Sequence, residues 1–197
     1  MMRRFLAAGF AWALLALLPG CSTSPAELNL CQRANTETKT VTSGDQRQTI
    51  VLAPIEDRRP ESMRQQLGVV GRRGVLGKDS AAWVEAALID LNGQNFRVVK
   101  SSDAQPLTGW LVKPRILQLY TSSLNVAKMA TVVIELELVG PENKTSTHVY
   151  NGRIAAANWG SGEGEIENSL RKALQKCLKQ MRTDLELVSR EGVQTKT

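Results

Sequence analysis

Hydrophobic and polar residues alternate most regularly in the stretch Ala127–Val139. The positions on one side of this stretch are all apolar: Ala130, Val132, Ile134, Leu136 and Leu138. The other side carries polar residues: Thr131, Glu135 and Glu137. A period of two residues is typical of a β-strand that buries one face. The stretch is therefore predicted to be a strand in a sheet that is covered on one side.

Two more β-rich segments flank this strand, at residues 110–121 and 146–157. The second is reached through the turn residues 140–143 (GPEN), so the three segments are expected to form an antiparallel meander. Pro114 lies inside the first segment and has no backbone N–H to donate. A proline there predicts a sheet edge or a bulge.

The earlier part of the chain predicts a strand, a helix and a second strand. Residues 49–55 (TIVLAPI) are β-rich, and residues 96–99 resemble them. Between them, Asp79 or Ser80 can cap a helix over residues 81–92, with Gly93 just after its end. One face of this helix is apolar: Val84, Ala87, Leu88 and Leu91. This order favours a βαβ crossover if the strands are parallel neighbours.

The last element is a long amphipathic helix over residues 165–188, with Lys and Arg on its polar face. Together these elements predict one α+β domain over residues 48–189, followed by a frayed tail at 190–197. Its order is βαβββα: a mixed, largely antiparallel sheet of about five strands with two helices packed on one face.

The N-terminus predicts export and lipid attachment. Arg3 and Arg4 precede a short apolar run, so residues 1–20 are interpreted as a signal peptide. Residues 18–21 (LPGC) resemble the lipobox of bacterial lipoproteins, which implies acylation of Cys21; a conventional secretory signal with an incidental cysteine is the alternative. Residues 21–47 are rich in polar side chains and are expected to be a disordered tether. Ser22, in place of Asp, favours an outer-membrane lipid anchor facing the periplasm.

Charge and cysteine usage fit this interpretation. Removing Arg3 and Arg4 lowers the formal charge from +6 to +4, which suits acidic lipid head groups, cell-wall polymer or an acidic envelope protein. Nucleic acid is an unlikely partner for an exported chain without a nucleic-acid motif. Cys31 and Cys177 would meet an oxidising compartment, so they are expected either to form a disulfide or to leave Cys177 as a buried free thiol.

The glycine-punctuated stretch 67–80 (LGVVGRRGVLGKDS) raises the question of a phosphate-binding loop. Arg72 stands where such a loop needs its first glycine, and Asp79 stands where it needs a hydroxyl. The stretch is therefore predicted to be a mobile loop. Its surroundings, residues 57–78, carry a basic excess: Arg58, Arg59, Arg64, Arg72, Arg73 and Lys78. These side chains are predicted to contact an acidic partner or, alternatively, only to solvate the loop.

Side chains for catalysis are scarce. His148 is the single histidine, so no histidine cluster can hold zinc, and no nucleophile elbow accompanies it. Glu135 and Glu137 share one strand face and are interpreted as a solvated or covered surface. The chain is predicted to be no enzyme and to need no metal or cofactor.

The whole pattern resembles the YajG-type bacterial lipoproteins. The resemblance is carried by Cys21, the strand running into residues 57–59 (DRR), the glycine-rich stretch, residues 92–96 (NGQNF), the strand triplet and the last helix. It implies a periplasm-facing, outer-membrane-anchored domain without an established activity.

Two function classes follow. The first is a non-enzymatic interaction or scaffold lipoprotein. The second is an auxiliary lipoprotein of a lipid-transporting ABC system, which would bind or relay lipid. A continuous apolar groove between helix and sheet would favour the second, and a filled core the first. The periodicity favours a filled core.

Overall fold

The structure is a computed structural model, and it describes residues 24–30, 47–70, 73–101, 109–124, 127–140, 144–157 and 162–194. Within these residues the elements follow one another in this order: β1 (Ala26–Asn29), β2 (Gln48–Leu52), β3 (Glu56–Asp57), α1 (Glu61–Arg64), β4 (Gln66–Val70), β5 (Arg73–Lys78), α2 (Ser80–Ile89), β6 (Phe96–Lys100), β7 (Trp110–Leu124), β8 (Ala127–Val139), β9 (Thr145–Ala157) and α3 (Glu163–Gln194).

The larger sheet has the strand order β6-β2-β7-β8-β9, and the short strand β3 also pairs with β7. Strand β2 runs parallel to both β6 and β7, whereas β7, β8 and β9 are antiparallel. The predicted meander and the parallel strand-helix-strand unit are therefore confirmed. The sheet has six strands instead of about five, because β3 continues the pairing of β2 along β7.

The irregularity predicted at Pro114 lies close by. The register between β7 and β8 shifts between Ile116 and Gln118, which marks a bulge. Pro114 itself lies between the residues of β7 that pair with β2, the last being Val112, and those that pair with β3, the first being Arg115. Pro114, which has no N–H to donate, therefore lies where the pairing with β2 ends and the pairing with β3 begins.

A second sheet, of order β1-β5-β4, is absent from the predicted fold. The stretch expected to be a mobile loop instead forms the antiparallel strands β4 and β5. The tether prediction is wrong for Ala26–Asn29, which pair in parallel with β5. The physical reason is burial: in an otherwise polar segment, Ala26, Leu28 and Leu30 have 8%, 9% and 0% of their surface exposed.

The small sheet packs closely on β7. A Cβ added at Gly68 of β4 would lie 2.0 Å from Oγ1 of Thr121, so only glycine permits this approach. The Thr121 hydroxyl donates a hydrogen bond of 3.0 Å to the carbonyl of Leu67. The glycine therefore serves a strand contact and not a flexible connection.

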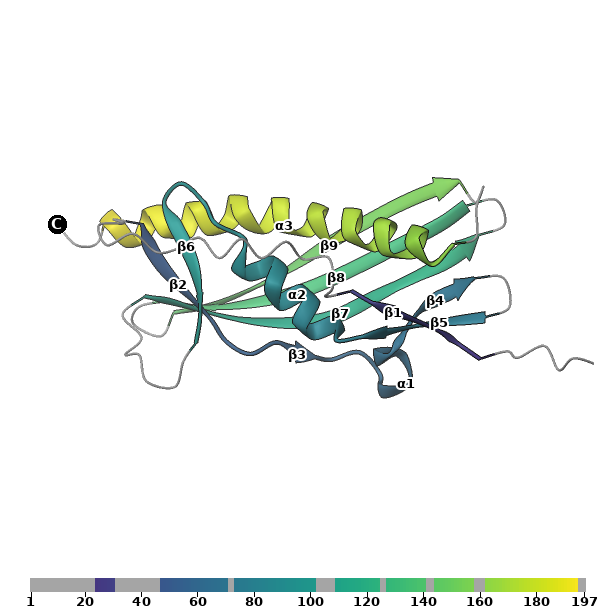
Figure 1. Cartoon of the computed structure of the whole chain (residues 1–197). Coiled ribbons are helices and arrows are strands. Elements are labelled where there is room, and N and C mark those ends of the chain that lie inside the picture. The colour runs from purple at the N-terminus through teal and green to yellow at the C-terminus, as the bar shows by residue number, and fades with distance from the viewer. Residues whose placement is uncertain are drawn as a thin grey trace, which may run out of the picture.

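Helices α2 and α3 cover one face of the larger sheet, as predicted (Figure 1). The apolar set of β8 is fully buried beneath them. A cavity of about 10 Å³ lies in the layer between the sheet and the helices, next to Leu52, Leu88 and Leu185. The core is filled.

The ends of both helices differ from the predicted ones. Helix α3 begins with Glu163 and continues to Gln194, so the part of the expected frayed tail at 190–194 is helical. Helix α2 ends at Ile89, before the predicted residue 92, and Gly93 lies beyond it, in contact with Phe96. Among the described helices, none is long and apolar enough to cross a bilayer.

Candidate functional site

The residue pair Asp57 and Arg59 lies in the basic segment predicted to contact a partner, but it is structural. The Arg59 side chain is 3% exposed. It forms two-pronged hydrogen bonds with the Asp57 carboxylate, the shorter being 2.7 Å, and donates to the carbonyls of Met63, Arg64 and Leu119. Burial acts to raise the pKa of the Asp57 carboxyl, but the hydrogen bonds and charge of Arg59 outweigh it, so this pKa lies below its usual value. Arg59 has no donor left for a ligand.

The other basic side chains of the segment also have contacts within the chain. Arg58 pairs with Glu56 at 3.0 Å and Lys78 pairs with Glu27. Arg64 donates to the carbonyl of Arg59, and Arg73 donates to that of Ser24. Arg72 lies outside the described residues.

Part of this segment surrounds a cleft of about 350 Å³ at the start of α2. The charged residues that line the cleft balance one another: Glu27, Asp57 and Asp79 against Arg59, Arg64 and Lys78. A cleft without net charge offers an acidic partner no particular attraction. The geometry gives little support to the predicted contact surface.

The cysteine predictions have different outcomes. Cys177 is a free thiol in the structure, so the disulfide with Cys31 is not formed there, while Cys21 and Cys31 lie outside the described residues. The Cys177 thiol is buried where α3 meets β8 and β9, and it donates to the carbonyl of Val132 at 3.4 Å. Burial raises its pKa to about 11. The backbones of α3 and β9 pack closely beside the thiol, at Ala173 and Gly152, and shield it from solvent.

Glu135 and Glu137 form an ionic cluster on the open face of the larger sheet. The Arg115 guanidinium bonds to both carboxylates, and Lys113 pairs with Glu137 at 2.8 Å. The hydrogen bond from Lys113, reinforced by Arg115, lowers the pKa of Glu137. The Glu137 carboxylate held this way stays ionised, which suits cross-strand pairing and not proton transfer.

His148 is half-buried on β9, and its imidazole Nε2 lies 3.2 Å from the Ser146 hydroxyl. Within the described ranges, no group of His, Cys, Asp or Glu side chains is arranged to hold a metal ion.

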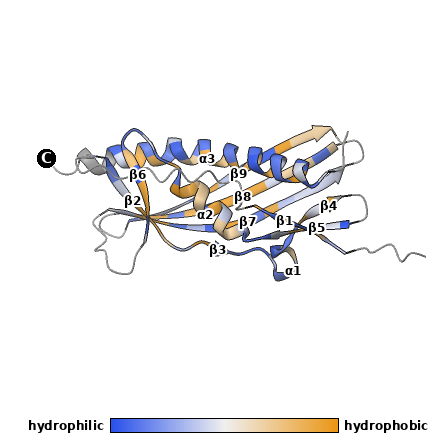
Figure 2. Ribbon diagram, in the orientation of Figure 1, coloured by the Kyte–Doolittle hydropathy of each residue, from blue (hydrophilic) through white to orange (hydrophobic). Residues whose placement is uncertain are grey.

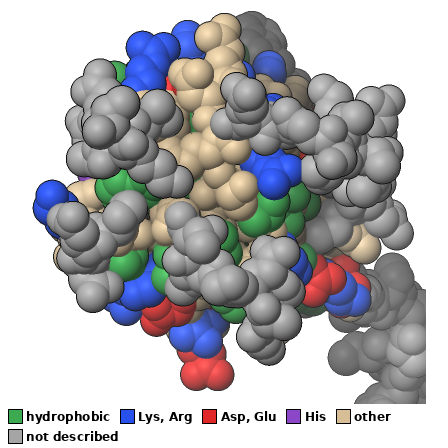
Figure 3. Space-filling view, turned by 90° about the vertical axis from the view of Figure 1, so that its left-hand side faces the viewer, with side chains coloured by type: hydrophobic (Ala, Val, Ile, Leu, Met, Phe, Trp, Pro, Cys, Tyr) green, Lys and Arg blue, Asp and Glu red, His purple; other side chains and the backbone are tan. Residues whose placement is uncertain are grey.

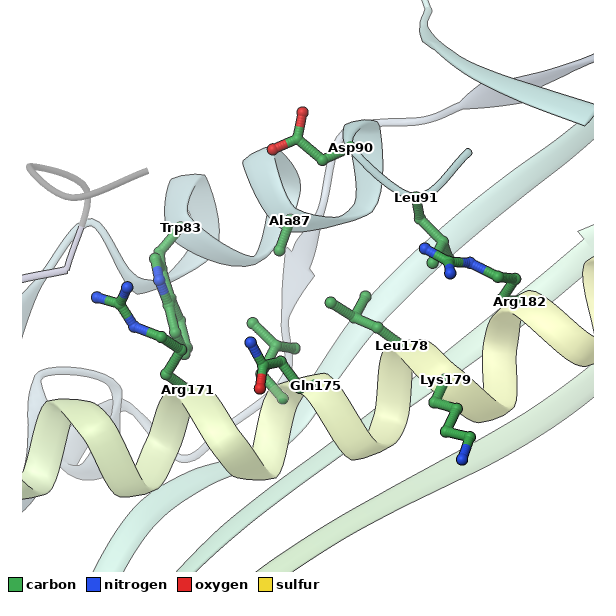
Figure 4. Close-up of a pocket in the computed structure, with 10 residues that line it drawn as sticks. Trp83, Ala87, Asp90, Leu91, Arg171, Gln175, Leu178, Lys179 and Arg182 are labelled. Atoms are coloured by element: carbon green, nitrogen blue, oxygen red, sulfur yellow. The ribbon is translucent and has the colours of Figure 1, made fainter. Parts of the chain in front are cut away.

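A groove of about 580 Å³ lies between α2 and α3 (Figure 4). We call it the α2–α3 groove. Its lining residues come from the two helices and the residues just after α2: Trp83, Ala87, Asp90, Leu91, Arg171, Leu174, Gln175, Leu178, Lys179 and Arg182. Trp83, Leu91 and Leu174 are at most 6% exposed and form a recessed apolar floor.

The two walls of the groove differ in chemistry. Helix α2 has one charged residue, Glu85, which pairs with Lys100, and Figure 2 shows this helix as mostly hydrophobic and α3 as largely hydrophilic. From Arg171 to Arg182, α3 carries five cations and no carboxylate. In Figure 4, Arg171, Gln175 and Leu178 reach toward α2, whereas Lys179 points away from it and Asp90 points away from α3.

Sequence reasoning missed this groove, although signals for it were present. Helix α2 is apolar nearly all round, which a surface helix rarely is. The run of cations in α3 by itself indicates only that one face of this helix is polar. What the sequence lacks is the position of α2 beside α3, which results from the order of the strands in the sheet.

Comparison with solved structures identifies a shared fold. Protein XCC0632 of Xanthomonas campestris, of the DUF330 family, superimposes with a TM-score of 0.52 at 9% identity, covering 76% of this chain and 89% of that protein. The two share a fold. At this identity the likeness extends to the fold alone.

Other bacterial structures are more distant. Lipoprotein GNA1162 of Neisseria meningitidis is 10% identical, with a TM-score of 0.37 over 65% of this chain and 96% of its own. The dodecameric PelC of Paraburkholderia phytofirmans is 8% identical, with a TM-score of 0.42 over 71% and 90%. With TM-scores below 0.5, neither likeness carries an argument about this chain. No family model and no curated protein matches the sequence, so the YajG-type resemblance stays a prediction.

Proposed function

We propose that the chain is a non-enzymatic lipoprotein of the bacterial envelope that acts as an interaction module, with the α2–α3 groove as its binding surface. The observation that carries this proposal is the contrast between the α2–α3 groove and the cleft at the start of α2. The cleft beside Arg59 is balanced in charge and built from side chains that already bond to one another. The groove combines an apolar floor with a basic wall whose Lys179 and Arg182 form no ion pair among the described residues.

The filled core supports this role over lipid relay. An ABC-associated lipoprotein that relays lipid needs an apolar cavity of at least a few hundred cubic ångströms to enclose an acyl chain, in the range of ~300–1,000 Å³ usual for ligand pockets. The cavity that Leu52, Leu88 and Leu185 line between the sheet and the helices measures about 10 Å³. The α2–α3 groove has the volume but lies open on the outer side of the helices.

The proposed location rests on the N-terminal sequence. Acylation of Cys21 would hold the chain on a membrane, since each buried methylene contributes ~0.8 kcal/mol, and Ser22 favours the outer membrane. The groove would then face the periplasm on a domain attached through residues that precede β1.

Photocrosslinking in intact cells tests the proposal. A benzoylphenylalanine residue replaces Gln175, an exposed residue of the groove, and in a matched variant replaces Arg58 in the segment first predicted to bind. We expect adducts from position 175 and few from position 58. Adducts from position 58 alone would refute the proposal and return the binding surface to the basic segment.

A further inference from the structure

We infer that the α2–α3 groove binds an acidic amphipathic helix of a partner protein. This inference rests on the proposed function, because it names the occupant of the same groove. It commits to a protein segment whose apolar side faces α2 and whose carboxylates face α3.

The dimensions of the groove fit a short helix. Its α3 wall extends from Arg171 to Arg182, which corresponds to about 16 Å, or about three helical turns, at 1.5 Å per residue. Three turns place apolar side chains at i, i+3 or i+4, and i+7 on one face, and helix-in-groove recognition uses this spacing. The recessed Trp83, Leu91 and Leu174 would receive those side chains.

The charges of the groove fit an acidic occupant. The lining contains Arg171, Lys179 and Arg182 against one acid, Asp90. Arg171 also pairs with Glu167 on its own helix, and Lys179 points away from α2 in Figure 4, so Arg182 is the cation most able to contact an occupant of the groove. Because Arg171 and Arg182 lie about three helical turns apart along the groove, negative charge that complements both must also be spread along the occupant.

Other occupants fit less well. A single lipid head group calls for cations gathered at one end, and a bilayer calls for protruding apolar side chains, whereas Trp83 and Leu174 are recessed. Residues 31–46 of this chain have no net charge, with Arg33 and Lys39 against Glu37 and Asp45, and few apolar side chains. Their composition does not complement the groove. At the end of the molecule seen in Figure 3, the described hydrophobic side chains appear among polar and charged ones.

The test uses the full-length chain with benzoylphenylalanine at position 175, crosslinked in cells, and sequences the adduct by mass spectrometry. It is repeated in the charge reversal Lys179→Glu/Arg182→Glu and in Lys172→Glu, a matched control on the same helix outside the groove. We expect the adduct to map to a partner segment with net negative charge and helical apolar spacing. The double reversal should reduce its yield roughly tenfold, while Lys172→Glu leaves the yield within about twofold. Thermal midpoints of the purified variants verify that they fold, and the single variant Arg182→Glu replaces the double variant if the double variant does not fold.

Each alternative outcome has a defined meaning. An adduct with a lipid, with residues 31–46, with a second copy of this chain or with a neutral or basic protein segment overturns the inference but leaves the groove as a binding surface. An equal loss in Lys172→Glu also overturns it, because the attraction would then be non-specific. The absence of any adduct at position 175 refutes the inference and the proposed function together.

Discussion

At Gly152 on β9 the backbone of α3 leaves no room for a Cβ, so replacement of this glycine by alanine tests the packing directly. A Cβ at this position would lie 1.9 Å from the carbonyl oxygen of Ala173 and 3.0 Å from the sulfur of Cys177. The obstructing atom belongs to the helix backbone, which cannot rotate aside as a side chain can. The helix must therefore move.

The size of the movement sets the expected cost. Ordinary contact begins near 3.4 Å, so α3 has to retreat by about 1.5 Å from β9. That movement loosens the packing of Leu170, Leu174 and Cys177, all of which are nearly fully buried. Overpacking of this kind costs ~1–3 kcal/mol, and the lower entropy of the unfolded alanine chain offsets ~0.4–1 kcal/mol. We expect a net loss of about 2 kcal/mol in the free energy of unfolding, or roughly 4–8 °C in Tm.

Urea and thermal unfolding, followed by circular dichroism, measure the change. Gly74→Ala is the matched control: it also lies in a strand, but no atom lies within 4 Å of its added Cβ, so its stability should stay within about 0.5 kcal/mol of the parent. Ala173→Gly should not rescue Gly152→Ala, because the clash is with the carbonyl and not with the methyl group. Equal stability of the two glycine variants, or rescue by Ala173→Gly, would refute the reasoning.

Four further outcomes are expected. Arg59→Ala should lower the free energy of unfolding by about 3–5 kcal/mol, since it leaves the partly buried Asp57 carboxylate and several carbonyls without their donor. In the same denaturation assay, Arg58→Ala should cost under about 1 kcal/mol. The pKa of Asp57 is lowered in the folded state, so its contribution to stability is present above the usual carboxyl pKa and is lost as pH falls through the folded value. The free energy of unfolding of Asp57→Asn should therefore change less with pH than that of the parent. The Cys177 thiol, with its pKa raised to about 11, should not react with Ellman's reagent at pH 8 until urea is added, and a thiol that remains unreactive in urea would indicate a disulfide. Cys21→Ser should move the protein out of the membrane fraction, and retention there would refute acylation as the anchor.

Local patterns in the chain were enough to predict the central architecture. The alternation in β8 and the helical spacing of α3 depend on neighbouring residues, and each burial pattern is repeated over many positions. A strand of period two can bury its apolar set only by turning one whole face to a covering layer. The meander and the two covering helices follow from that requirement.

The small sheet, the cleft at the start of α2 and the α2–α3 groove depend on contacts between distant parts of the chain. Strand β1 pairs with residues about fifty positions later in the chain. The polar residues around Leu28 and Leu30 do not predict that these two side chains are buried. The basic excess near Arg59 suggested an exposed contact surface, yet Asp57 and the carbonyl of Leu119 enclose that guanidinium. Composition indicates how many charges a segment carries, but the charges that remain for a partner are those whose neighbours in space do not already neutralise them. On α3, Lys179 and Arg182 belong to that remainder because strand order places the apolar helix α2 beside them.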